Sequence, residues 1–294
     1  MGKRILLFIV TNLAIVATLT IVVNVLGLTS GVSADGLNLG ALAMFCLFYG
    51  MAGAFISLQM SRWIAKRATG VKLITGGTGR PELDSLYATV ERLTRQANLP
   101  MAEVGVYDSP EVNAFATGPS KSRSLVAVSS GLLRSMRQEE IEGVLAHEVA
   151  HIANGDMVTM TLLQGVINAF VMFAARVIAH LMTRTSDNRG GNGGGMYFVT
   201  VMVLQIVLGI LGSLITAWFS RQREFRADHG GATLAGRASM IAALRRLAAN
   251  RELVDTRHEA LATMKINGAG RWMVFFSTHP PLEARIAALE NARF

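Results

Sequence analysis

The sequence has almost no cysteine and few charged residues. Cys46 is the only cysteine among 294 residues, which excludes an intramolecular disulfide bond and a zinc site built from several cysteines. Charged residues make up 16% of the chain, whereas an average soluble protein has about 25%. Hydrophobic residues make up 51%, and the mean hydropathy is positive. These values predict an integral membrane protein.

Acidic residues are also fewer than basic ones: 20 aspartates and glutamates stand against 28 lysines and arginines, which gives a formal net charge of +8. A nucleic-acid-binding protein would gather such an excess into a patch with interleaved aromatic side chains. Here the arginines and lysines instead stand beside apolar runs, where positive residues orient a membrane protein. We therefore expect a lipid bilayer as a partner and no nucleic acid.

Four apolar runs are long enough to cross a bilayer, which takes about 20 residues. They cover residues 5–27, 37–60, 157–182 and 196–220. The first run is longer than the apolar core of a cleaved signal peptide, which has about 7–15 residues. We interpret it as a retained anchor. For the last two runs, a buried hydrophobic hairpin that only dips into the bilayer is the alternative.

The positions of the positive residues predict the orientation of these runs. Lys3 and Arg4 precede the first run and Arg62 follows the second, whereas residues 28–36 contain neither lysine nor arginine. By the positive-inside rule, both ends of this hairpin lie in the cytoplasm. Arg221 follows the fourth run and favours the same orientation for the second hairpin. The chain is thus predicted to alternate between two transmembrane hairpins and two cytoplasmic segments that fold together, namely residues 1–60, 61–156, 157–220 and 221–294.

The cytoplasmic segments predict a mixed helix and strand structure. Residues 81–99 carry apolar side chains at helical spacing, with Pro81 in the first turn. Residues 103–107, 113–118 and 124–129 favour short strands of one sheet. We therefore expect a mainly α membrane protein with a small β-sheet, in which four transmembrane helices carry a cytoplasmic α+β domain.

A His-Glu-x-x-His motif lies within an uncharged, largely aliphatic stretch. His147 and His151 are four residues apart, so on a helix they share a face and can bind one ion. Two imidazoles at this spacing suit Zn²⁺, and Glu148 between them can act as a general base. A purely structural helix is disfavoured, because these polar groups would be buried without partners. We expect the helix to begin at Ser135, with Gln138 completing a capping box, and to stop at Asn154-Gly155.

A catalytic zinc generally has three protein ligands and one open position. Glu224 and Asp228 follow the fourth apolar run and are four residues apart, so on a helix they also share a face. Glu224 as the third ligand, with Asp228 accepting a hydrogen bond from a ligand histidine, would complete the site. Acids that only pair with arginines on an exposed helix are the alternative. Spacing alone leaves both interpretations open.

Taken together, His147-Glu148-x-x-His151 and Glu224-x-x-x-Asp228 resemble the gluzincin pattern of integral-membrane metalloproteases. More closely, the chain is similar to the HtpX family of bacterial membrane heat-shock proteases, which is related to the CAAX prenyl proteases. The resemblance covers nearly the whole chain. It includes residues 11–14, 113–118, 147–157, 218–221 and 278–282.

The resemblance implies a zincin-like zinc endopeptidase in the bacterial inner membrane that faces the cytoplasm and cleaves damaged or misassembled membrane proteins. It also implies that Glu224 is the third zinc ligand. It further implies that Asn113 and Ala114 form an extended segment that pairs with the substrate backbone; an ordinary turn and strand is the alternative. A homo-oligomer and other quality-control proteases stay open as further partners.

Two residues near the chain's last helix are candidates for stabilising the oxyanion. We expect Glu148 to move the proton of the attacking water and a second group to stabilise the oxyanion. His279 is the best candidate for that group, and the alternative is that it only caps the helix that follows Pro280-Pro281. Arg285 could be a second donor, but we interpret it as a solvated charge.

Three other functions are compatible with a membrane metal site. A scaffold or transporter with a structural metal would have polar residues spread through its spans, and the second and fourth runs have almost none. An intramembrane protease would have its ligands inside an apolar span, whereas His147 follows an acidic helix start. A peptidase that acts only on prenylated tails stays open, although a chamber for the lipid needs more than four spans.

Overall fold

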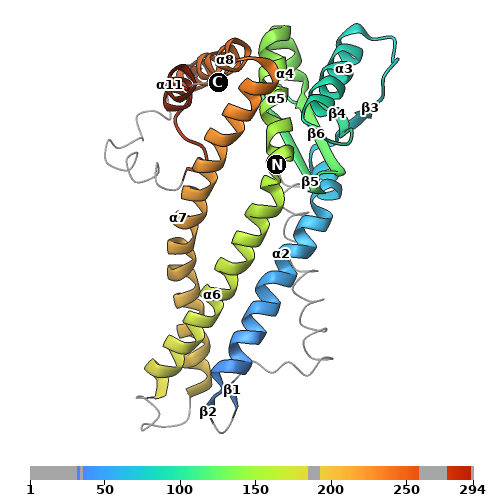
Figure 1. The fold of residues 1–294 in the computed structure, drawn as a ribbon. Helices are drawn as coiled ribbons and strands as arrows, with labels where there is room; N and C mark the ends of the chain where they lie inside the picture. The colour runs from blue at the N-terminus through green and yellow to red at the C-terminus, as the bar shows by residue number, and fades with distance from the viewer. Residues whose placement is uncertain (1–31, 34–35, 185–192, 258–276, 293–294) are drawn as a thin grey trace. The chain divides into compact units, whose positions relative to one another are not determined.

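The computed structural model describes residues 32–33, 36–184, 193–257 and 277–292 (Figure 1). The first predicted span, residues 5–27, lies outside the described residues. The chain divides into two compact units. The first unit comprises Met1–Ser57 and Met160–Thr216, and the second comprises Leu58–Thr159 and Ala217–Phe294.

Three of the described helices are long and apolar enough to cross a membrane. These helices are α2 (Leu39–Thr69), α6 (Asp156–Arg184) and α7 (Gly193–Ala235). They contain the second, third and fourth predicted spans, which confirms that these runs are long apolar helices. A pair of two-residue strands, β1 (Val32–Ser33) and β2 (Gly36–Leu37), precedes α2.

Small residues let the helices of the first unit approach closely. A Cβ atom added to Gly50 of α2 would lie 2.8 Å from backbone atoms of both Gly165 and Ala169 of α6. On α7, a Cβ added to Gly212 would lie 2.7 Å from Ile167 of α6. Close backbone approach at small residues is how helices pack in lipid, where no hydrophobic force drives them together. Large apolar side chains such as Phe170 and Phe198 remain exposed, as a lipid-facing surface requires.

The second unit contains a four-stranded sheet of order β3-β4-β6-β5. Its strands are β3 (Lys72–Ile74), β4 (Glu103–Tyr107), β5 (Ala114–Ser120) and β6 (Arg123–Ser129). β4 and β6 are parallel, whereas β3 and β5 run antiparallel to their neighbours. The three predicted strands are confirmed. The sequence does not predict β3, because three residues are too few to show the alternation of a strand.

Helices cover this sheet and complete the core of the second unit. They are α3 (Pro81–Gln96), α4 (Ser130–Ser135), α5 (Gln138–Asn154), α8 (Arg237–Arg257) and α11 (Leu282–Asn291). The helix α3 confirms the expected one, with Pro81 in its first turn and Leu86 buried. α5 packs against α3, α8 and the sheet. It contributes Leu145, Val149 and Ile152 to the core, and each of these is 0% exposed. The metal-motif helix is therefore central to this unit.

The predicted start of the motif helix is wrong and its predicted end is confirmed. Ser135 is the last residue of α4, so it does not cap α5. The N-cap of α5 is Arg137, whose backbone N–H donates to Oε2 of Glu140 at 2.7 Å. The short helix α4 lies directly before α5 and is capped by Ser129, whose Oγ accepts from the backbone N–H of Leu132 at 3.0 Å. At the other end, Gly155 adopts the left-handed conformation with φ 69° and ψ 28°.

Candidate metal centre

Three buried side chains bring metal-binding atoms together in the second unit. His147 and His151 come from α5 and Glu224 comes from α7. The Nε2 atoms of the two histidines lie 3.0 Å apart. Glu224 reaches both of them, with Oε2 at 3.5 Å from Nε2 of His147 and Oε1 at 3.4 Å from Nε2 of His151. The exposed fractions are 8% for His147, 9% for His151 and 0% for Glu224.

These separations fit a tetrahedral zinc ion. Zinc binds histidine nitrogen and carboxylate oxygen at about 2.0–2.2 Å, so neighbouring donors of a tetrahedron lie roughly 3.3 Å apart. The observed distances of 3.0, 3.4 and 3.5 Å lie close to that value. Two imidazoles and one carboxylate are also a ligand set that catalytic zinc uses. The residues present therefore fit the metal that the motif predicts.

The helix α7 can bring Glu224 to this point because small residues face α5. A Cβ atom added to Gly231 would lie 3.1 Å from the backbone nitrogen of His147, and one added to Gly230 would lie 3.0 Å from Ala150. The contact of Glu224 with Arg223 is only a long one, at 3.4 Å. The alternative interpretation of Glu224 as an exposed acid that only pairs with arginines is therefore wrong.

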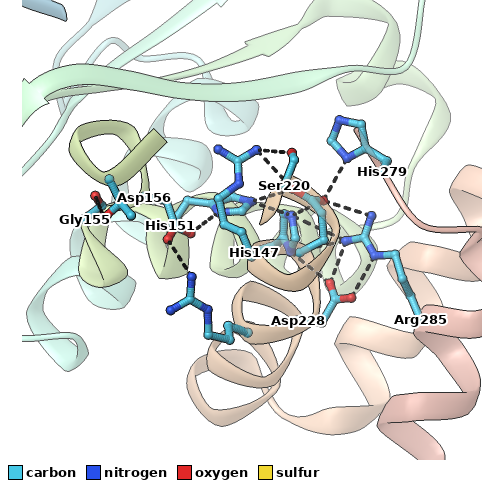
Figure 2. A network of polar contacts seen from close by, with 12 residues as sticks. His147, His151, Gly155, Asp156, Ser220, Asp228, His279 and Arg285 are labelled. Atoms are coloured by element: carbon cyan, nitrogen blue, oxygen red, sulfur yellow. Dashed lines mark hydrogen bonds and ion pairs between the residues drawn. The ribbon is translucent and has the colours of Figure 1, made fainter. Parts of the chain in front are cut away.

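Each ligand histidine has a carboxylate on its other ring nitrogen (Figure 2). Oδ1 of Asp228 lies 3.0 Å from Nδ1 of His147. Oδ2 of Asp156 lies 2.6 Å from Nδ1 of His151. Both carboxylates are 1% exposed. Helical spacing predicts the role of Asp228 but not that of Asp156. The one local signal for Asp156 is that an acid directly follows the glycine that ends the motif helix.

Arg285 is a buried part of this network, so its interpretation as a solvated charge is wrong. It is 6% exposed and donates from Nε to Oδ2 of Asp228 at 2.7 Å and from a terminal nitrogen to Oδ1 at 2.6 Å. Its other terminal nitrogen lies 3.4 Å from Oε2 of Glu224. An arginine on a short amphipathic helix is usually exposed. Arg285 can be buried because it contacts the carboxylates of Glu224 and Asp228, which come from the distant helix α7.

His279 lies at the edge of the same network. Its Nδ1 atom is 2.8 Å from Oε2 of Glu224, and its side chain is 63% exposed. Helix α11 has no side-chain cap, so the interpretation of His279 as a cap is wrong. Figure 2 shows His279 reaching the network on a segment separate from the two helices that carry the histidine ligands and Asp228.

The carboxylates give the centre a strong preference for positive charge. Burial by itself lowers the pKa of His151, but hydrogen bonds to Asp156 and Glu224 outweigh it and raise the pKa to about 9. Burial also opposes protonation of His147, and its contacts with Asp228 and Glu224 raise its pKa as well. The charge of Glu148, which is half-buried on α5, adds to the raised pKa of His151. The carboxylates therefore favour positive charge at the two histidines, whether it comes from a proton or from a bound cation.

Asn113 and Ala114 lie at the start of β5, the edge strand of the sheet beside α5. The backbone N–H of Asn113 donates to Oγ of Ser129 at 3.1 Å, and its carbonyl accepts from the backbone N–H of Ser129 at 2.9 Å. Among the described strands, β5 pairs only with β6. No other described strand pairs with the second edge of β5, and no described hydrogen bond joins Asn113 or Ala114 to the metal donors.

The chain is similar to known proteases. Residues 82–293 match the family model for Peptidase family M48. The chain is 51% identical to Protease HtpX of Idiomarina loihiensis over 292 residues, which are 99% of this chain and 100% of that protein. It is 50% identical to Protease HtpX of Aeromonas salmonicida over 294 residues, which are 98% and 100% of the two proteins. These matches confirm the resemblance drawn from the motifs.

A solved structure shares the fold. The crystal structure of S. mikatae Ste24p superposes with a TM-score of 0.62, and the match covers 98% of this chain and 66% of that one. The two sequences are 19% identical, so this likeness concerns the fold alone.

Proposed function

The chain belongs to peptidase family M48 as a zinc metallopeptidase of the HtpX type, and from that premise we propose that it cleaves misfolded or damaged membrane proteins at the cytoplasmic face of the bacterial inner membrane. The observation that carries the proposal is the tetrahedral spacing of three buried zinc donors in a chain with three membrane-length helices. A protease with a zinc centre and membrane-length helices is suited to the quality control of membrane proteins.

The distribution of positive charge supports the cytoplasmic orientation. Arg62, Lys66 and Arg221 belong to the second unit, which also carries the zinc donors. Positive residues next to spans stay in the cytoplasm, so the same side should hold the catalytic centre. We accordingly assign residues 1–60 and 157–220 to transmembrane hairpins and residues 61–156 and 221–294 to the protease domain.

Glu148 is the general base in this proposal. Bound by His147, His151 and Glu224, zinc supplies the Lewis acidity that lets water attack a peptide bond near neutral pH. Glu148 lies between the two histidines on α5 and is only half-buried, so its carboxylate can exchange protons with water. It takes the proton from the attacking water and passes it to the leaving amine, which restores the carboxylate.

Asp228 orients His147 and His279 stabilises the oxyanion. Asp228 accepts the Nδ1 proton of His147, which leaves the Nε2 lone pair free for the metal. His279 is exposed and donates from Nδ1 to Glu224, so its Nε2 offers a second N–H to a developing negative charge when the ring carries both protons.

The open edge of β5 is the proposed substrate site. An extended polypeptide added along β5 beside Asn113 and Ala114 would be held chiefly by main-chain hydrogen bonds. Because the backbone N–H of Asn113 already donates to Ser129, Asn113 would contribute through its side chain and the second lone pair of its carbonyl. Such binding makes little use of side-chain identity and requires an unfolded substrate. Broad specificity for unfolded segments follows, which agrees with a role in quality control.

The donor set also favours catalysis over a structural metal. A structural zinc site is closed by four protein ligands, whereas a catalytic site keeps one position open. Within the described residues, the cluster contains three donors. The metal site therefore supports an enzyme better than it supports a scaffold.

The proposal is tested with the detergent-solubilised full chain. The metal-free protein is incubated with an unfolded casein-type substrate and with a tightly folded soluble protein, before and after zinc is added back. We expect cleavage of the unfolded substrate only, lost with the chelator and restored by zinc. Cleavage that survives chelation, or equal cleavage of both substrates, would contradict the proposal.

Orientation is tested separately in cells. In a Cys46→Ser background, the exposed residues Ser122 and Gly194 are each replaced by cysteine. An impermeant thiol reagent should label the Gly194→Cys variant in intact cells and the Ser122→Cys variant only after the inner membrane is opened. Labelling of the Ser122→Cys variant in intact cells would place the protease domain on the other side.

A further inference from the structure

Asp156 directly follows Gly155, the glycine that ends the motif helix α5, and it contacts one of the zinc-ligand histidines. Asp156 is the first residue of α6, and its Oδ2 atom lies 2.6 Å from Nδ1 of His151 (Figure 2). It is 1% exposed. A carboxylate this far from water is retained only where its hydrogen bonds compensate for burial. The described partners of Asp156 are His151 and, at the longer distance of 3.8 Å, Arg226.

The backbone between α5 and α6 accounts for the contact. Gly155 is in the left-handed region, and its N–H donates to the carbonyl of Ile152 at 3.1 Å. Its own carbonyl accepts from the N–H groups of Val158 and Thr159, both at 3.1 Å. One residue therefore ends α5 and begins α6. The turn is tight enough to bring Asp156 back beside a histidine five positions earlier.

The two helix ends also favour this pair of charges. Asp156 occupies the first turn of α6, where the helix dipole stabilises an anion. His151 occupies the last turn of α5, where the dipole favours an imidazole that carries positive charge, whether from a proton or from a bound cation. Both effects strengthen a hydrogen bond from Nδ1–H to the carboxylate.

Asp156 and Asp228 differ in how their charge is neutralised. Arg285 makes two short hydrogen bonds to Asp228. The only cation near Asp156 is Arg226, among the described ion pairs, and its side chain is 62% exposed. Asp156 therefore keeps more of its negative charge for the histidine, which agrees with its shorter contact of 2.6 Å compared with 3.0 Å for Asp228.

We propose that Asp156 is the positioning residue for the zinc ligand His151. It accepts the Nδ1 proton, which fixes the tautomer with a free lone pair on Nε2, and it prevents rotation of the ring away from the ion. The proposal rests on the zinc site of the proposed function but not on the identity of the substrate. It also assigns a metal-centre role to the first turn of α6, a helix long and apolar enough to cross a membrane.

The test measures zinc binding by the full chain in detergent. Asparagine has nearly the same shape as aspartate and is also favoured at the start of a helix. It is uncharged, however, so it accepts the Nδ1 hydrogen bond of His151 more weakly in Asp156→Asn. The zinc dissociation constant, measured by competition with a chromogenic chelator, should rise by about 10–100-fold. Asp156→Glu restores the charge and should recover part of the loss. Glu283→Gln, an exposed acid in the first turn of α11, is the matched control and should bind zinc like the wild type.

A spectroscopic measurement separates positioning from a general loss of structure. In the cobalt-substituted protein, the visible absorption bands should change in Asp156→Asn and stay unchanged in Glu283→Gln. The metal-free Asp156→Asn protein should keep a single cooperative unfolding transition, at a lower temperature than the metal-free wild type because the buried pair with His151 is lost. If Asp156→Asn does not fold, Asp156→Ser and Asp156→Glu serve in its place.

Unchanged zinc affinity together with an unchanged cobalt spectrum in Asp156→Asn would overturn the proposal. An equal loss of zinc in Asp156→Glu and Asp156→Asn would also overturn it, because the carboxylate charge would then not matter. Failure of the wild-type protein to cleave any polypeptide would count against the proposed function alone, since zinc affinity is measured without substrate.

Discussion

Arg285 clamps Asp228 through two parallel hydrogen bonds, from Nε to Oδ2 at 2.7 Å and from a terminal nitrogen to Oδ1 at 2.6 Å. Both side chains are buried, and Asp228 in turn contacts Nδ1 of His147. A guanidinium fork matches a carboxylate in both geometry and charge, so this pair holds its atoms more firmly than a single ion pair would. Helix α11 is thereby connected to the metal centre.

Replacing Arg285 with methionine should destabilise the protein strongly. The variant leaves the carboxylate of Asp228 buried without its counter-charge, and breaking such a buried pair costs about 3–5 kcal/mol. Thermal unfolding of the metal-free protein in detergent measures the loss. Arg245→Met is the matched control, because the ion pair of Arg245 with Glu290 is exposed and contributes about 0–1 kcal/mol. Equal losses in the two variants would contradict the importance assigned to Arg285.

Replacing Glu148 with glutamine should abolish most of the activity and spare the metal. Glutamine keeps the shape of the side chain but cannot take a proton, and a general base contributes about 10²–10⁴-fold to the rate. Cleavage of an unfolded substrate measures the rate, and metal analysis of the same sample measures zinc. Wild-type cleavage by a zinc-loaded Glu148→Gln protein would show that another group moves the proton.

Replacing Glu224 with alanine should remove the metal itself. Two histidines alone provide fewer ligands than the three that a catalytic zinc site uses, so zinc should fall from about one ion per chain toward none. Metal analysis after gel filtration measures the stoichiometry. Glu283→Ala, on an exposed position of α11, should retain its zinc. Full occupancy in Glu224→Ala would reject Glu224 as a ligand.

Zinc affinity should fall as the pH is lowered below about 9. The pKa of His151 is raised to about 9 in the metal-free centre, so near neutral pH this histidine carries a proton that zinc must displace. Each displaced proton makes the apparent affinity fall about tenfold for each pH unit below the pKa. Chelator competition at several pH values measures the slope. An affinity that is constant between neutral pH and pH 9 would show that no proton is displaced.

Replacing Gly155 with alanine should strain the corner between α5 and α6. An added Cβ atom would meet only Lys121, at 4.0 Å, so no clash occurs. The cost arises from the left-handed backbone, which disfavours residues other than glycine by about 1–2 kcal/mol. Thermal unfolding measures this cost. Gly194→Ala, where space is also open and the backbone is not left-handed, is the control and should change stability little.

Features that depend on nearby residues could be predicted from the sequence. The spacing of His147 and His151 requires nothing beyond helical periodicity, and the stop at Gly155 follows from one residue type. The helices α2, α6 and α7 can also be predicted locally, because each contains a continuous apolar run long enough to cross a membrane. The start of α5 failed because Ser135 is an equally good local signal, and only the preceding helix α4 rules it out.

Features that depend on packing between distant segments could not be predicted from spacing. The role of Glu224 was left open by the residues themselves, because its contact with His147 depends on the glycines that let α7 approach α5. The burial of Arg285 cannot be predicted for a related reason, because its own helix alone does not distinguish it from an exposed arginine. Asp156 was overlooked because a sharp corner, rather than a repeat, brings it to His151. The resemblance to a known family supplied Glu224 but neither of the other two.

The participation of Arg285 has a consequence for the order of events during biosynthesis. The histidines of the centre are synthesised more than a hundred residues before Arg285, and Asp228 also precedes it. Until residue 285 leaves the ribosome, Asp228 lacks its buried counter-charge and the orientation of His147 lacks its support. A nascent chain thus carries the motif without the completed centre.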